Sequence, residues 1–202
     1  MKIEEQQYQD ILREIGNIGG GNALTSLSQL MGAKLELGLP NCQIVNRQNF
    51  SKLFQEPGTL YAGVSMKLEG KLACMLALLL NKEFTSMVLR QVAGEEVTDV
   101  RHLNEMQKSA VCEIGNIMCN SYITAFSRLM GQGMDASASV PSMVVDTGEE
   151  VLKSFLKGYG DTSEDLLFVG NTFYYQKKEL ASHILFHPTV ASLDEILKHL
   201  GE

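Results

Sequence analysis

The sequence lacks a hydrophobic stretch long enough to cross a lipid bilayer. Its longest apolar run, residues 72–80, falls well short of the roughly 20 residues that a membrane-spanning helix requires. The opening residues, MKIEEQQYQD, contain no apolar segment of the secretory type, so we expect no cleaved leader. Together these absences predict a cytoplasmic protein that does not insert into membranes.

Positive charge is also scarce. The 202 residues include 17 Lys and Arg against 24 Asp and Glu, which gives a net charge of −7. A general nucleic-acid-binding protein needs basic surface to displace counterions from phosphates, and adhesion to an anionic membrane needs the same kind of surface. The charge balance therefore argues against nucleic acid and against membrane as partners.

Closely spaced thiols are missing as well. The four cysteines, Cys42, Cys74, Cys112 and Cys119, form no C-x-x-C pair, and no histidine lies near them at the spacing of a zinc site. We therefore expect reduced, partly buried cysteines rather than a redox or metal site.

What the sequence does contain is an internal repeat. Residues 11–32 and 110–131 align without a gap at an offset of 99, with ten identities in 22 positions. The segment Glu-Ile-Gly-Asn-Ile is the same in both copies. Chance does not produce such a match, so we interpret the chain as a duplicated unit with repeats over about residues 1–98 and 99–202.

Each repeat predicts the order helix, strand, strand, helix, strand, strand, helix. In the first repeat we expect helices at 4–31, 49–55 and 82–93 and strands at 34–39, 42–46, 60–68 and 71–80. In the second we expect helices at 101–130, 149–158 and 192–200 and strands at 134–139, 142–147, 165–175 and 180–188. Hairpin signals such as Gly70 favour a mixed or largely antiparallel sheet covered by helices. This predicts an α+β fold in a single pseudo-twofold domain over residues 1–202, with two long helices that carry the repeated segment.

A polar stripe follows the first long helix. At 100° per residue the stripe spans an arc of about 60°, and its members are Asp10, Glu14, Asn17, Gly21 and Ser28. The isoleucines lie on another side, which predicts that this other side faces the core. The second long helix repeats the stripe with Ser109, Glu113, Asn116, Asn120 and Ser127.

A solvated helix face is the simplest explanation of one such stripe. Two copies favour a function instead, because the Glu–Asn pair is kept while neighbours such as Gly21 and Asn120 differ. Gly16 and Gly115 lie between the Glu and the Asn, although a helical Gly costs roughly 1 kcal/mol relative to Ala. Either these glycines let the backbone of another protein approach, or they permit tight packing between helices.

These residues resemble the signature of the CheC/CheX/FliY family of bacterial and archaeal chemotaxis phosphatases. That signature is Asp or Ser, three residues, Glu, two residues, Asn, twenty-two residues and Pro. The first copy matches it with Asp10, Glu14, Asn17 and Pro40. The second copy matches with Ser109, Glu113 and Asn116, and its nearest proline, Pro141, lies two residues late, which suggests a small insertion near residues 132–133. Two complete motifs in one short chain are most similar to the CheC type.

The resemblance implies a substrate and a role for each residue. The substrate would be the aspartyl phosphate of the phosphorylated response regulator CheY. The Mg²⁺ would be supplied by the regulator itself, so this chain would need no metal site and no cofactor of its own. Asn17 and Asn116 would each position a water molecule, and Glu14 and Glu113 would pair with a lysine of the regulator. Asp10, Ser109 and Pro40 would have docking roles.

Two other functions remain open. The chain could be a non-enzymatic adaptor for the receptor deamidase CheD, or a flagellar-switch scaffold of the FliM type. Both Glu–Asn pairs favour the phosphatase over the scaffold, but they do not separate phosphatase from adaptor, since one molecule can be both. We expect a monomer with two sites on well-separated faces, and CheD as an additional partner.

Overall fold

The computed structural model describes residues 2–54, 56, 58–70, 73–94, 96–129, 136–157 and 164–192. The first repeat supplies α1 (Lys2–Met31), β1 (Glu36–Leu37), β2 (Asn41–Asn46), η1 (Arg47–Leu53), β3 (Leu60–Gly70), β4 (Cys74–Asn81) and α2 (Lys82–Ala93). The second supplies η2 (Val100–His102), α3 (Glu105–Leu129), β5 (Ala136–Ala138), β6 (Ser142–Thr147), α4 (Gly148–Leu156), β7 (Asp165–Tyr175) and β8 (Lys178–Pro188). The predicted α+β class is confirmed.

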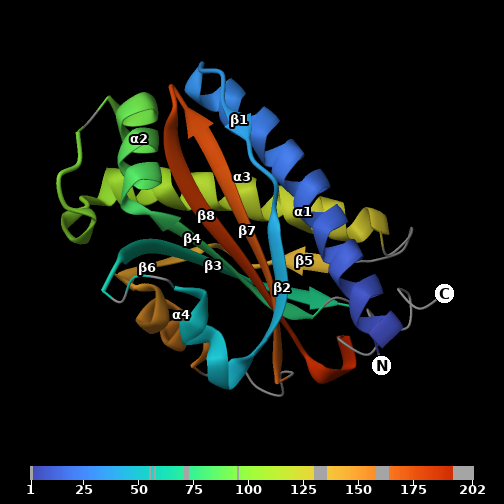
Figure 1. Ribbon diagram of the computed structural model, residues 1–202. Helices are drawn as coiled ribbons and strands as arrows, with labels where there is room; N and C mark the ends of the chain where they lie inside the picture. Colours follow the sequence, from blue (N-terminus) through green and yellow to red (C-terminus); the bar gives the residue numbers. More distant parts are fainter. Residues whose placement is uncertain are drawn as a thin grey trace.

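The strands form one antiparallel sheet in which the repeats exchange their first strands (Figure 1). The order is β1-β7-β8-β4-β3-β5, with β2 also paired to β7 and β6 to β3. The short strands of the first repeat therefore complete the β7–β8 hairpin of the second, and the reverse holds for β5 and β6. At the centre β4 pairs with β8, where Leu78 lies opposite Ile184.

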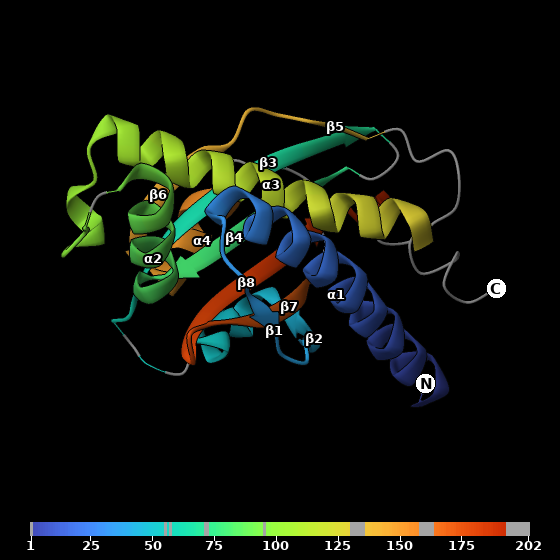
Figure 2. The same ribbon diagram turned by 90° about the horizontal axis from the view of Figure 1, so that it is seen from above.

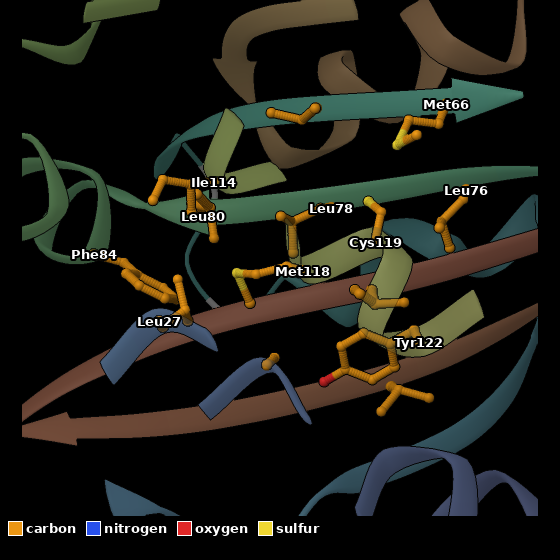
Figure 3. Close-up of a cluster of buried hydrophobic side chains, with 14 of the residues drawn as sticks. Leu27, Met66, Leu76, Leu78, Leu80, Phe84, Ile114, Met118, Cys119 and Tyr122 are labelled. Carbon is orange, nitrogen blue, oxygen red and sulfur yellow. The ribbon is translucent and has the colours of Figure 1, made fainter. Parts of the chain in front are cut away.

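Both faces of this sheet are covered. Successive side chains of a strand point to opposite faces, so alternate residues of β4 enter two different clusters. Leu76, Leu78 and Leu80 pack with residues of α1, α2 and α3 (Figure 3), whereas Met75, Ala77 and Leu79 pack with residues of α4 and η1. This two-sided burial explains why the sequence is continuously apolar here rather than alternating.

The long helices α1 and α3 pack against each other on one face of the sheet (Figure 2). Gly19 makes the contact close, because a Cβ at this position would lie 2.5 Å from a ring carbon of Tyr122. The buried Tyr122 hydroxyl accepts a hydrogen bond from the side-chain amide of Asn171 on β7. The three successive glycines at 19–21 are thus part of a continuous helix.

The predicted start of the second long helix, residue 101, is wrong. Residues 100–102 form the short helix η2, and α3 begins at Glu105. The cause is a capping box: the backbone N–H of Asn104 donates to Gln107 Oε1 and the N–H of Gln107 donates to Asn104 Oδ1, both at 2.9 Å.

Other bounds shift by a few residues. The first strand, predicted over 34–39, is reduced to Glu36–Leu37. Several predicted residues lie outside the described part of the chain: most of the helix 192–200, and residues 71–72, 130, 134–135 and 158 of other elements. Within the described part, no helix is both long and apolar enough to span a bilayer.

Candidate functional site

The first stripe lies on the outward side of α1. Asp10, Glu14 and Asn17 are all exposed. Gly16 faces the sheet, since a Cβ there would lie 3.1 Å from Val169 Cγ1 of β7. Gly19, which faces α3, lies about 60° from Gly16 around the helix, and Asn17 lies about 100° in the other direction. Asn17 therefore points away from α3.

The contacts of Gly20 show which strand lies on the side of α1 that carries Asn17. Gly20 is about 40° from Gly16 in the same direction as Asn17, and a Cβ there would lie 3.0 Å from Leu37 of β1. The first stripe thus faces outward above the sheet edge formed by β1 and β2.

The second stripe has the matching position at the other edge. Gly115 faces β3, where a Cβ would lie 2.6 Å from Val64 Cγ1. Glu113 and Ser109 are exposed and Asn116 is half-buried. Because β7 and β3 lie toward opposite ends of the strand order, the two Glu–Asn pairs lie over opposite edges of the sheet.

The two interior glycines therefore have a role that the sequence did not predict. Both are buried, and both face a strand of the other repeat: Gly16 meets Val169 and Gly115 meets Val64. Neither is open to the backbone of another protein, and neither makes the helix–helix contact, which falls to Gly19. Gly16 and Gly115 hold the Glu–Asn pairs at a fixed height above the sheet.

Pro40 supports the first pair from below. A Cβ on Gly16 would lie 2.8 Å from Pro40 Cβ, so the proline packs directly under the turn that carries Glu14 and Asn17. Pro141 lies between β5 and β6, as Pro40 lies between β1 and β2. Although Pro141 lies two residues later in its motif than Pro40 does, it occupies the equivalent connection between two short strands.

Neighbouring polar groups differ between the two sites. Beside the first pair, Asp10 forms an exposed ion pair with Arg13, at 3.5 Å between Oδ1 and an Nη. Beside the second pair, Asn116 Oδ1 accepts a hydrogen bond of 2.9 Å from Asn120 Nδ2. Asn120 belongs to the predicted stripe without a predicted role, and its i, i+4 spacing from Asn116 is the signal for such a contact.

Burial makes three of the four cysteines, Cys42, Cys74 and Cys119, poor nucleophiles. Cys42 donates its thiol hydrogen to the Leu12 carbonyl (3.2 Å), and burial raises the pKa of Cys42 to about 11. Burial raises the pKa of the fully buried Cys74 and Cys119 to about 12. Since the thiolate is the reactive form, these groups are inert at neutral pH. Across the described ranges, no three His, Cys, Asp or Glu side chains gather at a distance that could hold a metal ion.

The sheet with two long helices defines a fold class that is known from chemotaxis and flagellar-switch proteins. The solved structure of Thermotoga maritima FliY matches with a TM-score of 0.73 and 22% identity, over 96% of this chain and 95% of that one. The FliM middle domain of H. pylori matches with a TM-score of 0.65 and 10% identity, over 98% of this chain and 99% of that one.

Sequence comparison finds a family model and named relatives that match this chain. The model of the CheC-like family matches residues 9–38 and 106–143, which contain both Glu–Asn pairs. The CheY-P phosphatase CheC of Bacillus subtilis (strain 168) is 27% identical over 98% of this chain and 96% of its own length. The flagellar motor switch phosphatase FliY of the same organism is also 27% identical, over 87% of this chain but 44% of its own length. The chain is thus similar to the CheC-like family in both repeats, and to a relative named CheY-P phosphatase CheC over nearly its whole length.

Proposed function

We propose that this protein is a phosphatase that hydrolyses the aspartyl phosphate of a CheY-type response regulator. The observation that carries the proposal is the outward-facing Glu–Asn pair, present at the same place on α1 and α3 and within both segments matched by the family model. Relatives that share the whole length of the chain include one named as a CheY-P phosphatase. On this proposal the protein works in the cytoplasm, where such regulators are found.

The chemistry needs little from the catalyst. An acyl phosphate is already labile, so a water molecule placed in line with the phosphorus can attack it while the bond to the aspartate oxygen breaks. The electrons of that bond go to the aspartate carboxylate, and the water proton goes to the released phosphate. Asn17 or Asn116 accepts a hydrogen bond from the water through its carboxamide oxygen and so supplies position rather than basicity.

The remaining residues serve to hold the regulator. Glu14 and Glu113 are exposed carboxylates one turn before the asparagines, and each would form an ion pair with a lysine of the regulator. Asp10 and Ser109, another turn away, would add weaker docking contacts. Pro40, partly buried against Gly16, would act by fixing the helix. The Mg²⁺ of the reaction would stay on the acidic residues of the regulator.

The decisive experiment follows the decay of phosphorylated CheY with Asn17→Ala, Asn116→Ala and the double variant. We expect each single variant to retain part of the activity, because the other site is intact, and the double variant to lose nearly all of it. Asn17 is an exposed helix position, where a substitution changes stability by roughly 0.5 kcal/mol or less, and Ala is a better helix former than Asn at both positions. Circular dichroism of each variant is the folding control.

One outcome would reverse the conclusion. If the folded double variant dephosphorylates CheY at the wild-type rate, the asparagines do not position the water, and the adaptor for the deamidase CheD becomes the better hypothesis. Co-purification of CheD with the wild type and the double variant tests that alternative, since we expect CheD to bind independently of the asparagines.

A further inference from the structure

Two large apolar side chains stand out on the described surface by their exposure. Leu39 is 93% exposed and Val140 is 87% exposed, well above the next large hydrophobic residue, Met106 at 66%. Each directly precedes the proline of its motif, Pro40 or Pro141. Single exposed apolar residues are ordinary on protein surfaces. Here, however, the two most exposed ones occupy the same place in both repeats.

The backbone around both residues is fixed in the same way. The N–H of Gly38 donates to the Thr172 carbonyl of β7 at 2.8 Å, and the N–H of Ser139 donates to the Lys67 carbonyl of β3 at 2.9 Å. On the other side, strand pairing resumes at Asn41, opposite Gly170 in one case, and at Ser142, opposite Ser65 in the other. The following proline restricts the backbone of the exposed residue further.

These two positions lie beside the Glu–Asn pairs. Pro40 packs under Gly16, so Leu39 is one residue from the support of the first pair, on the sheet edge above which Asn17 faces outward. Val140 has the corresponding place on the β5–β6 edge, beside β3, on which α3 rests. A protein docked on either stripe, large enough to cover it, would also cover the apolar residue at that edge.

We propose that Leu39 and Val140 are contact residues for the phosphorylated regulator, one at each site. This inference rests on the proposed function and deepens it. Each side chain would bury itself against apolar surface of the regulator beside its phosphorylated aspartate, which also excludes water from the adjacent Glu–lysine ion pair. One residue is too small to form an interface, because a stable one buries about 800 Å² on each partner. Leu39 and Val140 therefore add to docking by the stripe and do not replace it.

The test isolates one site at a time. In an Asn116→Ala background, where the first site alone turns over, we expect Leu39→Ser to raise the KM for phosphorylated CheY roughly 5- to 20-fold with little change in kcat, as befits the loss of one buried side chain. Val140→Ser in the same background is the matched control and should leave KM unchanged. In an Asn17→Ala background, where the second site alone turns over, Val140→Ser should raise the KM and Leu39→Ser should leave it unchanged. Leu39→Met, which restores an apolar side chain, should recover the KM.

A binding experiment separates this inference from the proposed function. The Asn17→Ala Asn116→Ala protein is titrated with CheY activated by beryllofluoride. We expect two regulators per chain, and Leu39→Ser should weaken one of the two binding events roughly 5- to 20-fold while leaving the other unchanged. If the wild type neither binds nor dephosphorylates CheY, the proposed function fails. If it does both and Leu39→Ser changes neither KM nor binding, the inference is overturned. It is also overturned if the serine variants alter only self-association in sedimentation velocity, since the occupant is then a second copy of the chain.

Discussion

Asn120 on α3 binds Asn116 twice: its Nδ2 donates to the backbone carbonyl and to Oδ1 of Asn116, each at 2.9 Å. The equivalent position on α1 is Gly21, where a Cβ would meet nothing within 4 Å. The carboxamide of Asn116 is therefore held by the side chain of Asn120, whereas Gly21 has no side chain that could hold Asn17. The two otherwise similar sites differ in how firmly the carboxamide of the asparagine is held.

We predict that this difference appears in turnover. In an Asn17→Ala background, Asn120→Ala should lower kcat about 2- to 5-fold, because one hydrogen bond of about 0.5–1 kcal/mol no longer orients Asn116. In an Asn116→Ala background, Gly21→Asn should raise kcat by a similar factor, and Gly21→Ala is its matched control. Single-turnover decay of phosphorylated CheY measures both. Equal effects of Gly21→Asn and Gly21→Ala would show that helix stability, not orientation, is responsible.

Adding a methyl group to an interior glycine should have opposite effects at buried and open positions. Gly115→Ala places a Cβ within 2.6–2.8 Å of three Val64 atoms, and overpacking of this kind lowers the free energy of unfolding by about 1–3 kcal/mol. Gly21→Ala meets no neighbour and should raise it by about 0.5–1 kcal/mol. Urea titrations of both variants provide the measurement. A neutral result for Gly115→Ala would mean that α3 is free to shift away from β3.

The glutamates should act on association and the asparagines on the chemical step. We predict that Glu113→Gln in an Asn17→Ala background raises the KM for phosphorylated CheY and weakens its dependence on salt, because the variant keeps the shape of the side chain but loses the charge that attracts the lysine. Steady-state kinetics at two ionic strengths give both quantities. Wild-type salt dependence in the variant would argue against an ion pair at Glu113.

The stability of the fold should depend on pH through His183. This histidine lies on the α4 side of β8 among Phe54, Tyr61 and Phe168, with ring centroids 5.4–6.4 Å away, and burial lowers its pKa from 6.5 to about 4. Between these values the unfolded chain binds a proton that the folded chain does not, so the free energy of unfolding falls as the pH falls from 6.5 to 4. The full effect is about 3 kcal/mol.

Replacing the imidazole tests this assignment. His183→Phe keeps an aromatic ring and removes the titration, so its loss of stability between pH 6.5 and 4 should be smaller than that of the wild type. Chemical denaturation at several pH values gives the two curves, and their difference isolates His183 from the carboxylates, which titrate in both proteins. Parallel curves would assign the acid sensitivity to other groups.

The sequence predicted those features that depend on local periodicity. The bounds of α2, β6 and β7 agree with the predicted 82–93, 142–147 and 165–175, and the polar stripes emerged because helical spacing places their members on one side. The exchange of strands between the repeats was not predictable, since an alternating segment shows that it is a strand but not which strand it will join. The role of Gly16 was missed for the same reason, because Val169 lies more than 150 residues away in the chain.

The crossed support of the helices has a consequence for how such a chain can arise. Since part of the surface beneath α1 belongs to β7 and part of the surface beneath α3 belongs to β3, a polypeptide holding one repeat would lack these contacts for its own helix. Two such polypeptides would have to meet and trade strands, an encounter that depends on their concentration. Joining them in one gene makes the meeting intramolecular, at an effective concentration on the order of millimolar. Once the repeats are joined, the outer sides of the two helices are free to diverge. The strand residues beneath each helix stay under selection, because they support the helix of the other repeat.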